Sequence, residues 1–123
     1  MRIITGKARG CRLKTPKGEA TRPTADRIKE SLFNILGRRV EEARVLDLFA
    51  GTGALGLEAL SRGAASALFV DEKTASLIEE NAAKTRLLER AEVVRADVLR
   101  ILTRLGGAGR SFDLIFCDPP YRR

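Results

Sequence analysis

The sequence predicts an α/β fold in which helices connect a parallel sheet of about four core strands. Short apolar runs alternate with helical segments from residue 24 onward. A glycine-rich turn at residues 51–56 joins the first of these runs to the next helix, and an acidic residue lies at or just beyond the end of each run. This alternation favours parallel strands with right-handed crossovers. At 123 residues the chain is one domain.

Residues 1–22 are predicted to form a small basic extension of β type that precedes a core of residues 23–123. Residues 2–4 and 12–14 are its short strand candidates, because glycines interrupt the chain around them. Thr24 is the predicted N-cap of a helix that ends near Gly37. The apolar face predicted for this helix consists of Ile28, Leu32, Ile35 and Leu36.

The core is predicted to contain four strands and three further helices. Strands are expected at residues 44–49, 67–71, 92–95 and 112–117, and helices at about 54–62, 74–88 and 98–105. Cys117 ends the last strand, where we expect a buried, small apolar residue. In the strand order 3-2-1-4 the fourth strand is a sheet edge with uncovered apolar faces, which favours aggregation.

The positive charge is concentrated near the amino terminus. The net charge is +7, yet residues 1–39 hold 11 Lys and Arg against three acids, whereas residues 40–123 hold 12 against 13. Phosphate contacts by this segment would give a salt-dependent affinity for nucleic acid, and the alternative is a solvated basic tail. The predicted RNA-binding residues are Lys7, Arg9, Arg12, Lys14 and Arg22.

The composition argues against a metal site and against a membrane partner. The chain has no His, and Cys11 lies too far from Cys117 to form a paired metal-ligand motif, so no metal is predicted. No apolar run reaches the length of a membrane span, and the first residues lack a signal peptide. This cysteine usage fits a reducing cytoplasm, which is the expected location.

The turn Gly51-Thr52-Gly53-Ala54-Leu55-Gly56 satisfies the G-x-G-x-x-G pattern of dinucleotide-binding sites, and Asp71 follows 20 residues after its first glycine. An NAD-binding oxidoreductase domain is therefore an alternative, as is a purely structural turn. Asp47 argues against NAD, because a carboxylate at this strand end would repel a pyrophosphate and could attract the ammonium group of S-adenosylmethionine.

One acidic residue accompanies each predicted strand, and these are Asp47, Asp71, Asp97 and Asp118. Parallel strands bring such residues to one edge of the sheet. There Asp71 can accept both hydroxyls of a ribose, and Asp97 can accept from an adenine amino group, although Asp97 can instead be a helix N-cap. The order 3-2-1-4 would place Asp118 in the crevice between the first and fourth strands.

The tetrapeptide Asp118-Pro119-Pro120-Tyr121 suits the methylation of an exocyclic amino nitrogen, whose lone pair is delocalised into the ring of a base. Asp118 and a backbone carbonyl near Pro119 can accept its two N–H groups and stabilise the charge that develops during attack. The prolines hold that carbonyl rigidly, and Tyr121 offers a face on which a flipped base can stack. The alternative is an ordinary turn at a strand end.

Residues 45–64 (VLDLFAGTGALGLEALSRGA), together with the D-P-P-Y tetrapeptide, resemble the class I, Rossmann-like methyltransferases. Residues 1–6 (MRIITG) and 22–34 (RPTADRIKESLFN) resemble more specifically the RsmD family. This resemblance covers the whole chain and implies methylation of N2 of a guanine in 16S ribosomal RNA. S-adenosylmethionine is the implied cofactor and S-adenosylhomocysteine its product. The implied partner is 16S ribosomal RNA or a small-subunit assembly intermediate, and the implied full-length form is a monomer.

The resemblance also implies roles for particular residues. It places the tetrapeptide at 118–121 around the target guanine and the extension around Lys7, Arg9 and Arg12 against RNA. Arg22, Thr24 and Asp26 are expected to help close the cofactor site. The implied cofactor-binding residues are Asp47, Phe49, Ala50, Gly51, Thr52, Gly53, Asp71, Glu72, Asp97 and Val98.

The chain departs from the family pattern at two points. Asp71-Glu72-Lys73 stands where the family more often has Glu followed two residues later by an acid or amide. Family members also continue past D-P-P-Y, so we expect a truncated form with low activity on its own. Three alternatives to the RNA methyltransferase remain: an amino-methyltransferase for DNA adenine or cytosine or for a protein amide, a non-catalytic RNA-binding fragment, and the NAD-binding domain.

Overall fold

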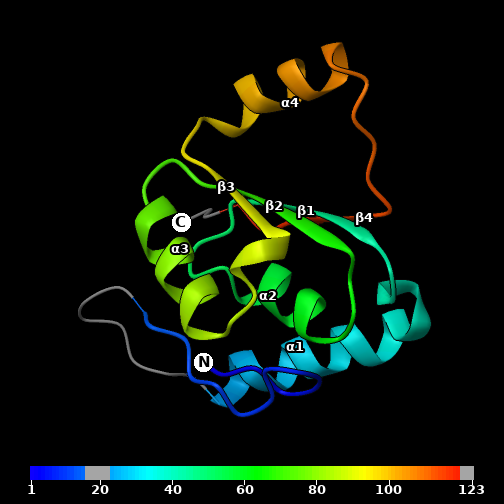
Figure 1. Ribbon diagram of the computed structural model, residues 1–123, viewed down its shortest axis with the longest axis vertical. Coiled ribbons are helices and arrows are strands. Elements are labelled where there is room, and N and C mark those ends of the chain that lie inside the picture. The colour runs from blue at the N-terminus through cyan, green and yellow to red at the C-terminus, as the bar shows by residue number, and fades with distance from the viewer. Residues whose placement is uncertain (16–22, 120–123) are drawn as a thin grey trace.

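The computed structural model describes residues 1–15 and 23–119 and contains one parallel sheet in the order β3-β2-β1-β4 (Figure 1). The strands are β1 (Arg44–Leu48), β2 (Ser66–Val70), β3 (Ala91–Val94) and β4 (Leu114–Cys117). The predicted order 3-2-1-4 is therefore confirmed. Each strand lies within one or two residues of its predicted position.

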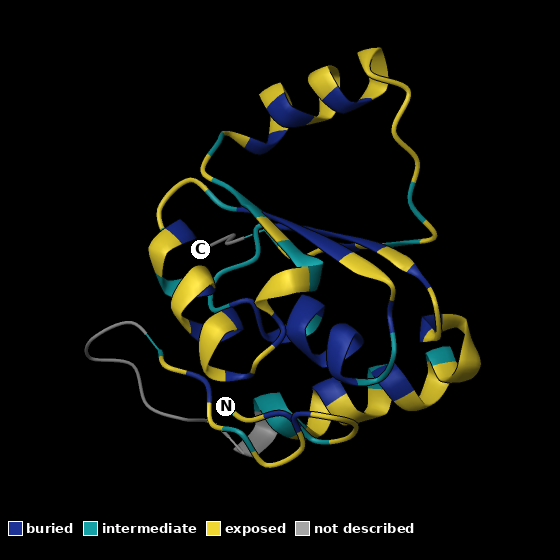
Figure 2. Cartoon of the chain, viewed as in Figure 1, coloured by how far each residue is buried: buried dark blue, intermediate teal, exposed yellow. Residues whose placement is uncertain are grey.

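Helices cover both faces of the sheet. The helices α1 (Pro23–Leu36), α2 (Ala54–Ser61) and α3 (Ala75–Lys84) lie on one side, and α4 (Val98–Gly107) lies on the other (Figure 1). Two short 3-10 helices, η1 (Gly37–Val40) and η2 (Leu88–Arg90), follow α1 and precede β3. Helix α2 is almost completely buried between the sheet and the amino-terminal segment (Figure 2).

The side chains of β1 point alternately to the two faces of the sheet, and each face has its own core cluster. Val45 packs into the cluster shared with α2 and α3, whereas Leu46 and Leu48 pack into the cluster shared with α4. Successive side chains of a strand point to opposite faces, so a strand covered on both sides is apolar at nearly every position. This double coverage accounts for the continuous apolar runs that located β1 and β2.

The apolar face predicted for α1 is wrong at two of its four positions. Ile28 and Ile35 are 65% and 78% exposed, while Lys29 is only 2% exposed and Phe33 is buried. The buried lysine has partners in the interior: its Nζ lies 3.1 Å from a carboxylate oxygen of Glu58 and donates a hydrogen bond of 2.6 Å to the carbonyl of Arg2. The ion pair thus allows Lys29 to be buried on the same face of α1 as Phe33.

Two helix boundaries also differ from their predictions. Helix α1 begins at Pro23, so Thr24 lies inside it and is not its N-cap. Proline suits the first turn of a helix, where its missing N–H costs no hydrogen bond. Helix α3 ends at Lys84, before the predicted residue 88, and the chain turns at Arg86 with a φ of 61°. This left-handed conformation interrupts a helix.

The edge strand β4 is covered on one face only. Phe116 is buried and packs against Phe33 of α1, with ring centroids 5.7 Å apart. On the opposite face Ile115 is 58% exposed and Cys117 is exposed, so the expectation of a buried Cys117 is wrong. The reason is the position of α4, which packs over β1 and β2 and leaves this end of the sheet uncovered.

Residues 1–15 form a basic arm that is docked onto the core. A single antiparallel bridge pairs Arg2 with Arg12, in place of the two predicted short strands. The N–H of Ile3 donates to the carbonyl of Cys11 over 2.8 Å, and Ile3 and Leu13 are buried in the same cluster as α2. This part of the predicted extension is therefore no free tail.

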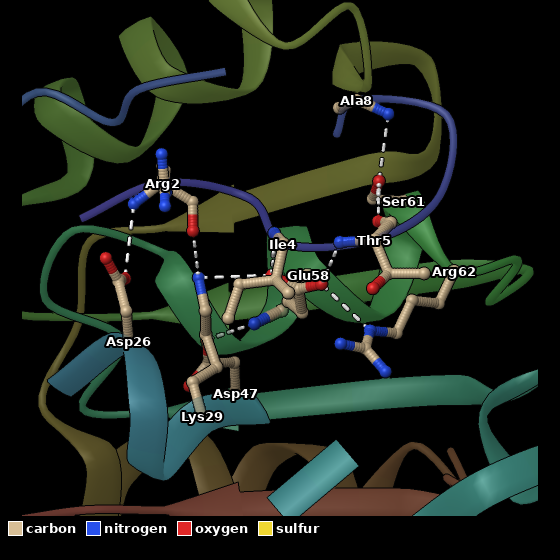
Figure 3. Close-up of polar contacts among 11 residues, drawn as sticks. Arg2, Ile4, Thr5, Ala8, Asp26, Lys29, Asp47, Glu58, Ser61 and Arg62 are labelled. Atoms are coloured by element: carbon tan, nitrogen blue, oxygen red, sulfur yellow. Dashed lines mark hydrogen bonds and ion pairs between the residues drawn. The ribbon is translucent and has the colours of Figure 1, made fainter. Parts of the chain in front are cut away.

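Glu58 of α2 anchors the arm from below (Figure 3). Its two carboxylate oxygens accept hydrogen bonds from the N–H groups of Ile4 and Thr5, at 2.9 and 3.1 Å. The same fully buried carboxylate is paired with Lys29 at 3.1 Å and with Arg62 at 2.8 Å. Two cations and two backbone donors thus replace the water that this charge loses on burial.

Ser61 makes the second anchor, one turn further along α2 (Figure 3). Its hydroxyl accepts from the N–H of Ala8 at 2.9 Å and donates to the carbonyl of Thr5 at 2.7 Å. Between these residues Gly6 adopts a φ of +92°, and a Cβ there would lie 1.9 Å from the carbonyl oxygen of Ser61. The arm can follow this path only with glycine at position 6.

We expect Glu58→Ala to lower the free energy of unfolding by about 3–5 kcal/mol, because it leaves Lys29 buried without its carboxylate. Urea unfolding followed by circular dichroism measures this change. Glu92→Ala is the matched control, since Glu92 forms an exposed pair with Arg110 at 3.3 Å and its loss should cost less than about 1 kcal/mol. Equal losses for the two variants would contradict the role assigned to Glu58.

Candidate functional site

The candidate site lies where the strand order of the sheet reverses. The chain leaves β1 through α2 to reach β2 on one side, whereas β4 joins the other side of β1 after β3 and α4. Open α/β sheets bind their ligands at such a switch point, outside the carboxyl ends of the strands. The glycine turn after β1 and the acids after β2 and β4 all lie at this edge.

The turn after β1 has an unusual backbone. Phe49 adopts a φ of 57°, which is uncommon for a residue with a side chain, and Gly51 and Gly53 adopt 59° and 85°. The N–H of Ala50 donates to the carbonyl of Val70 over 3.0 Å, which ties the turn to the end of β2. The chain therefore reverses sharply at the strand end and starts α2 directly behind it.

Gly56 allows α2 to approach the sheet closely. A Cβ at this position would lie 2.3 Å from the ring of Phe69 on β2, well inside the contact distance of two carbons. The N–H of Gly56 donates to Asp47 Oδ2 over 3.0 Å. The third glycine of the pattern thus serves helix–sheet packing, as the fingerprint requires.

Asp47 supplies the helix cap that Gly53 cannot. Gly53 occupies the N-cap position of α2 and has no side chain with which to satisfy the first-turn N–H groups. The carboxyl of Asp47, only 2% exposed, accepts one of them instead. Sequence reasoning missed this role, although an aspartate inside a buried strand is itself a sign of a specific internal partner.

Burial raises the pKa of Asp47 to about 8, against the opposing effect of the hydrogen bond from Gly56. The nearby carboxylates of Asp118 and Asp71 raise the pKa further. At neutral pH the group is therefore mostly protonated in the free chain. A cation placed close to it would favour the charged form.

Asp71 connects the turn after β1 with the start of α3. Its Oδ2 accepts from the N–H of Gly51 at 3.0 Å, and its Oδ1 accepts from the N–H groups of Lys73 and Thr74 at 2.8 and 3.1 Å. Burial by itself raises the pKa of Asp71, but the hydrogen bonds from Lys73 and Gly51 outweigh it and hold the pKa below its usual range. This half-buried aspartate is ionised at neutral pH.

Asp97 occupies the N-cap position of α4, but its side chain makes no capping hydrogen bond. Its exposed carboxylate shares an open hollow after β3 with Glu72 and Arg95. Val98, also predicted to contact a cofactor, has its side chain buried against the sheet in the α4 layer. The hollow is lined by Glu72, Asp97 and three arginines together with Val94, Ala96 and Ile101, and Val98 is not among its lining residues.

Asp118 directly follows β4, and its side chain is exposed. The last pair in the ladder joins Leu48 to Cys117, so Asp118 emerges beside Phe49 at the start of the glycine turn. The sheet thus brings this aspartate to the turn, as the strand order predicted. Pro119 is half-buried, and Pro120 and Tyr121 lie outside the described residues.

The basic residues predicted to bind RNA are displayed on the docked arm. Lys7, Arg9 and Arg12 are exposed, and Lys14 is exposed in an ion pair of 3.1 Å with Glu80. Arg22 lies outside the described residues. Asp26, which was expected to help close the cofactor site, accepts a hydrogen bond of 3.3 Å from the N–H of Arg2 in the arm. A hollow between the arm and α1 is lined by Arg2, Ile4, Arg9, Arg12, Asp26, Arg27 and Glu30.

Within residues 1–15 and 23–119, no group of three His, Cys, Asp or Glu side chains is placed to hold a metal ion. In the same part of the chain, no helix has the length and apolar character to cross a bilayer.

The chain is similar to known proteins along its whole length. The family described as Conserved hypothetical protein 95 (Cons_hypoth95) matches residues 1–123. Putative rRNA methyltransferase YlbH of Bacillus subtilis is 44% identical over 124 residues, which cover 99% of this chain and 67% of the relative. Ribosomal RNA small subunit methyltransferase D of Escherichia coli (strain K12) is 42% identical over 125 residues, covering 100% of this chain and 61% of that protein.

Solved structures give the same likeness. A putative methyltransferase, yhhF, from Escherichia coli superposes with a TM-score of 0.86 at 41% identity, covering 100% of this chain and 66% of that one. SMU.776, a putative methyltransferase complexed with SAH, has a TM-score of 0.66 at 25% identity, covering 76% of this chain and 25% of that one. The chain spans 61–67% of the length of the two curated relatives.

We expect Gly56→Ala to lower the free energy of unfolding by about 1–3 kcal/mol, because the new methyl group would press into the ring of Phe69. Gly106→Ala in α4 is the matched control: its Cβ would meet no atom within 4 Å, and alanine favours the helix by about 0.5–1 kcal/mol. Thermal and urea unfolding measure both changes. A Gly56→Ala protein as stable as the control would contradict the close contact.

We expect the stability contributed by Asp47 to fall as the pH rises from about 4 to about 8. The folded chain holds this proton up to a pKa of about 8, whereas the ordinary value is 3.8, so raising the pH removes it from the unfolded state first. Asp47→Asn keeps an acceptor for the N–H of Gly56 and should lack this slope. Urea unfolding of both proteins between pH 5 and 8 measures the difference, and parallel curves would contradict the raised pKa.

Proposed function

The chain belongs to the family described as Conserved hypothetical protein 95, the RsmD family, and on this premise we propose that it methylates the exocyclic N2 amino group of a guanine in 16S ribosomal RNA, using S-adenosylmethionine. The observation that carries the proposal is the meeting of three sequence features at one sheet edge. They are the glycine turn after β1, Asp71 after β2 and Asp118 after β4.

The residues at this edge fit the implied cofactor. A Cβ at Gly51 would meet no atom within 4 Å, so the space beside the turn is open to a ligand. The ionised Asp71 adjoins that space through its bond to Gly51. An acid at this position suits the ribose of either NAD or S-adenosylmethionine, and the methyltransferase relatives together with Asp118 at the same edge favour S-adenosylmethionine. S-adenosylmethionine supplies a methyl group that an amine can attack.

We assign the cofactor contacts in the order in which the strands lie. Gly51 and Gly53 surround the methionine part, together with Phe49, Ala50 and Thr52 of the same turn, while the buried carboxyl of Asp47 acts from behind the turn through its charge. Asp71 and Glu72 accept hydrogen bonds from the ribose hydroxyls, and Asp97 accepts one from the adenine amino group. Val98, the next residue in the chain, is the last of the assigned cofactor-binding residues. This sequence follows β1, β2 and β3 outward from the switch point.

Asp118 performs the recognition of the target amine. Its carboxylate is exposed at the switch point, where it can accept one N–H of the guanine amino group. That hydrogen bond raises the electron density on the nitrogen and stabilises the positive charge that forms as it attacks. The carbonyl region of Pro119 accepts the second N–H, and Tyr121 stacks on the base. Positioning of this kind provides most of the rate.

The exposed basic residues of the arm give the proposed contact with RNA. Lys7, Arg9 and Arg12 are exposed on a segment that is hydrogen-bonded to α2, so their charges lie close to the core. Phosphate contacts by these residues provide affinity without reading the sequence. The proposed partner is 16S ribosomal RNA or a small-subunit assembly intermediate, met in the cytoplasm by a protein that is a monomer at full length.

We expect Asp118→Asn to lower methyl transfer to 16S ribosomal RNA by about 10²–10³-fold, because it removes the negative charge that stabilises the developing ammonium. The affinity for S-adenosylhomocysteine, measured by calorimetry, should change by less than about twofold. Transfer is measured with a labelled methyl group, and the methylated nucleoside is identified by mass spectrometry after digestion of the RNA.

Asp113→Asn is the matched control, since this exposed aspartate lies just before β4 and pairs with Arg44 at the start of β1. Both residues are at the amino ends of the strands, away from the candidate site at the carboxyl ends. The variant should leave both transfer and affinity unchanged. N2-methylguanine as the product supports the proposal, and a methylated adenine or cytosine would favour the alternative of a different acceptor base. A chain that binds no S-adenosylhomocysteine in calorimetry would contradict the cofactor assignment.

A further inference from the structure

A single buried side chain joins the basic arm to the glycine turn. Asn81 of α3 is fully buried, and its amide bonds the backbone of two segments that are far apart in the sequence. Its Oδ1 accepts from the N–H of Lys14 at 2.7 Å, and its Nδ2 donates to the carbonyl of the same residue at 2.9 Å. The Nδ2 also donates to the carbonyl of Thr52 at 2.9 Å.

These bonds use the full donor capacity of the amide. An asparagine side chain has two N–H donors and one carbonyl oxygen, and here each donor has a backbone partner while the oxygen accepts. Release of any one partner would leave a buried polar group unpaired, at a substantial cost. The positions of Lys14 and Thr52 are therefore linked through one rigid group.

The two linked segments belong to different parts of the proposed function. Lys14 lies on the arm that displays Lys7, Arg9 and Arg12, whereas Thr52 lies between the two glycines of the proposed cofactor turn. On either side of Thr52 the turn is connected to the fold, through the bond from Gly51 to Asp71 and through Gly53 at the N-cap position of α2. A ligand that orders this turn also orders the carbonyl to which Asn81 donates.

We propose that Asn81 is a positioning residue that couples cofactor binding to RNA binding. The inference rests on the proposed function, because it requires that the turn binds the cofactor and the arm contacts RNA. A ligand at the turn fixes Thr52, Thr52 fixes Asn81, and Asn81 fixes the end of the arm. RNA then meets an arm that is already ordered, so each ligand raises the affinity for the other by the same factor.

Other contacts attach the arm to the core independently of Asn81, so a change of Asn81 can test the coupling without detaching the arm. The side chains of Glu58 and Ser61 hold residues 4–8 of the arm on α2, and within the described part of the chain neither side chain bonds the glycine turn. They would keep the arm on the core when Asn81 is changed. The exposed pair of Lys14 with Glu80 joins the arm to α3 by a side chain, and exposed pairs of this kind contribute little.

The test is a binding cycle with the 123-residue chain at one fixed salt concentration. The affinity for an RNA hairpin taken from 16S ribosomal RNA is measured by fluorescence anisotropy, without and with saturating S-adenosylhomocysteine. We expect the cofactor product to raise the RNA affinity by at least about fivefold. In Asn81→Ala this factor should fall to about one, because the link between Thr52 and Lys14 is gone.

Two matched controls lie next to Asn81 in α3. Ala82→Gly removes a fully buried methyl group and weakens the helix but leaves the side chain of Asn81 in place, and Glu80→Gln removes the exposed pair with Lys14. Both should keep the coupling factor of the unchanged chain. If the factor persists in Asn81→Ala, or falls equally in Ala82→Gly, the proposal is overturned.

A second measurement, made on the unchanged chain, tests the coupling even if the Asn81→Ala variant does not fold. In the unchanged chain, S-adenosylhomocysteine should slow the hydrogen exchange of the Lys14 amide by at least about fivefold, because this N–H donates to Asn81. No slowing overturns the coupling. Binding of both ligands without any mutual effect overturns the coupling alone, whereas the absence of S-adenosylhomocysteine binding overturns the proposed function and the coupling together.

Discussion

The close contact of α2 with the sheet is the constraint on which the rest of the structure depends. Gly56 lets the helix sit against Phe69, and Asp47 binds the N–H of the same glycine from inside β1. With the helix fixed there, its amino end sets the path of the glycine turn, and its outer surface presents Glu58 and Ser61 to the arm. One helix therefore positions both the candidate cofactor site and the basic segment.

Much of the fold could be predicted, because strand runs, glycines and strand-end acids are local signals. The predicted Rossmann-like class I methyltransferase fold is confirmed by the sheet order and by the structural relatives. The errors arise where a distant partner decides. Lys29 can be buried beside Phe33 because Glu58, 29 residues away in the sequence, pairs with it, and Ile28 and Ile35 face outward although an apolar periodicity favoured them.

The candidate site was predictable in its composition but not in its internal bonding. The acids after β2 and β4 lie at one edge, as parallel strands require. The capping role of Asp47 and the bond from Gly51 to Asp71 depend on contacts between different structural elements, which no periodicity of the sequence encodes. The role of Asn81 could not be predicted for the same reason. Its partners Lys14 and Thr52 are far from it in the sequence, and only the structure brings them together.

The docking of the arm has a consequence for the order of events during synthesis. Its hydrogen bonds to α2 and α3 span 53 to 67 residues of sequence, from Ile4, Thr5 and Ala8 to α2 and from Lys14 to α3. At about 5–20 residues per second, the ribosome needs roughly 3–13 s after Lys14 to add Asn81. The arm is thus synthesised before the helices that hold it, and until they form it is a solvated basic peptide.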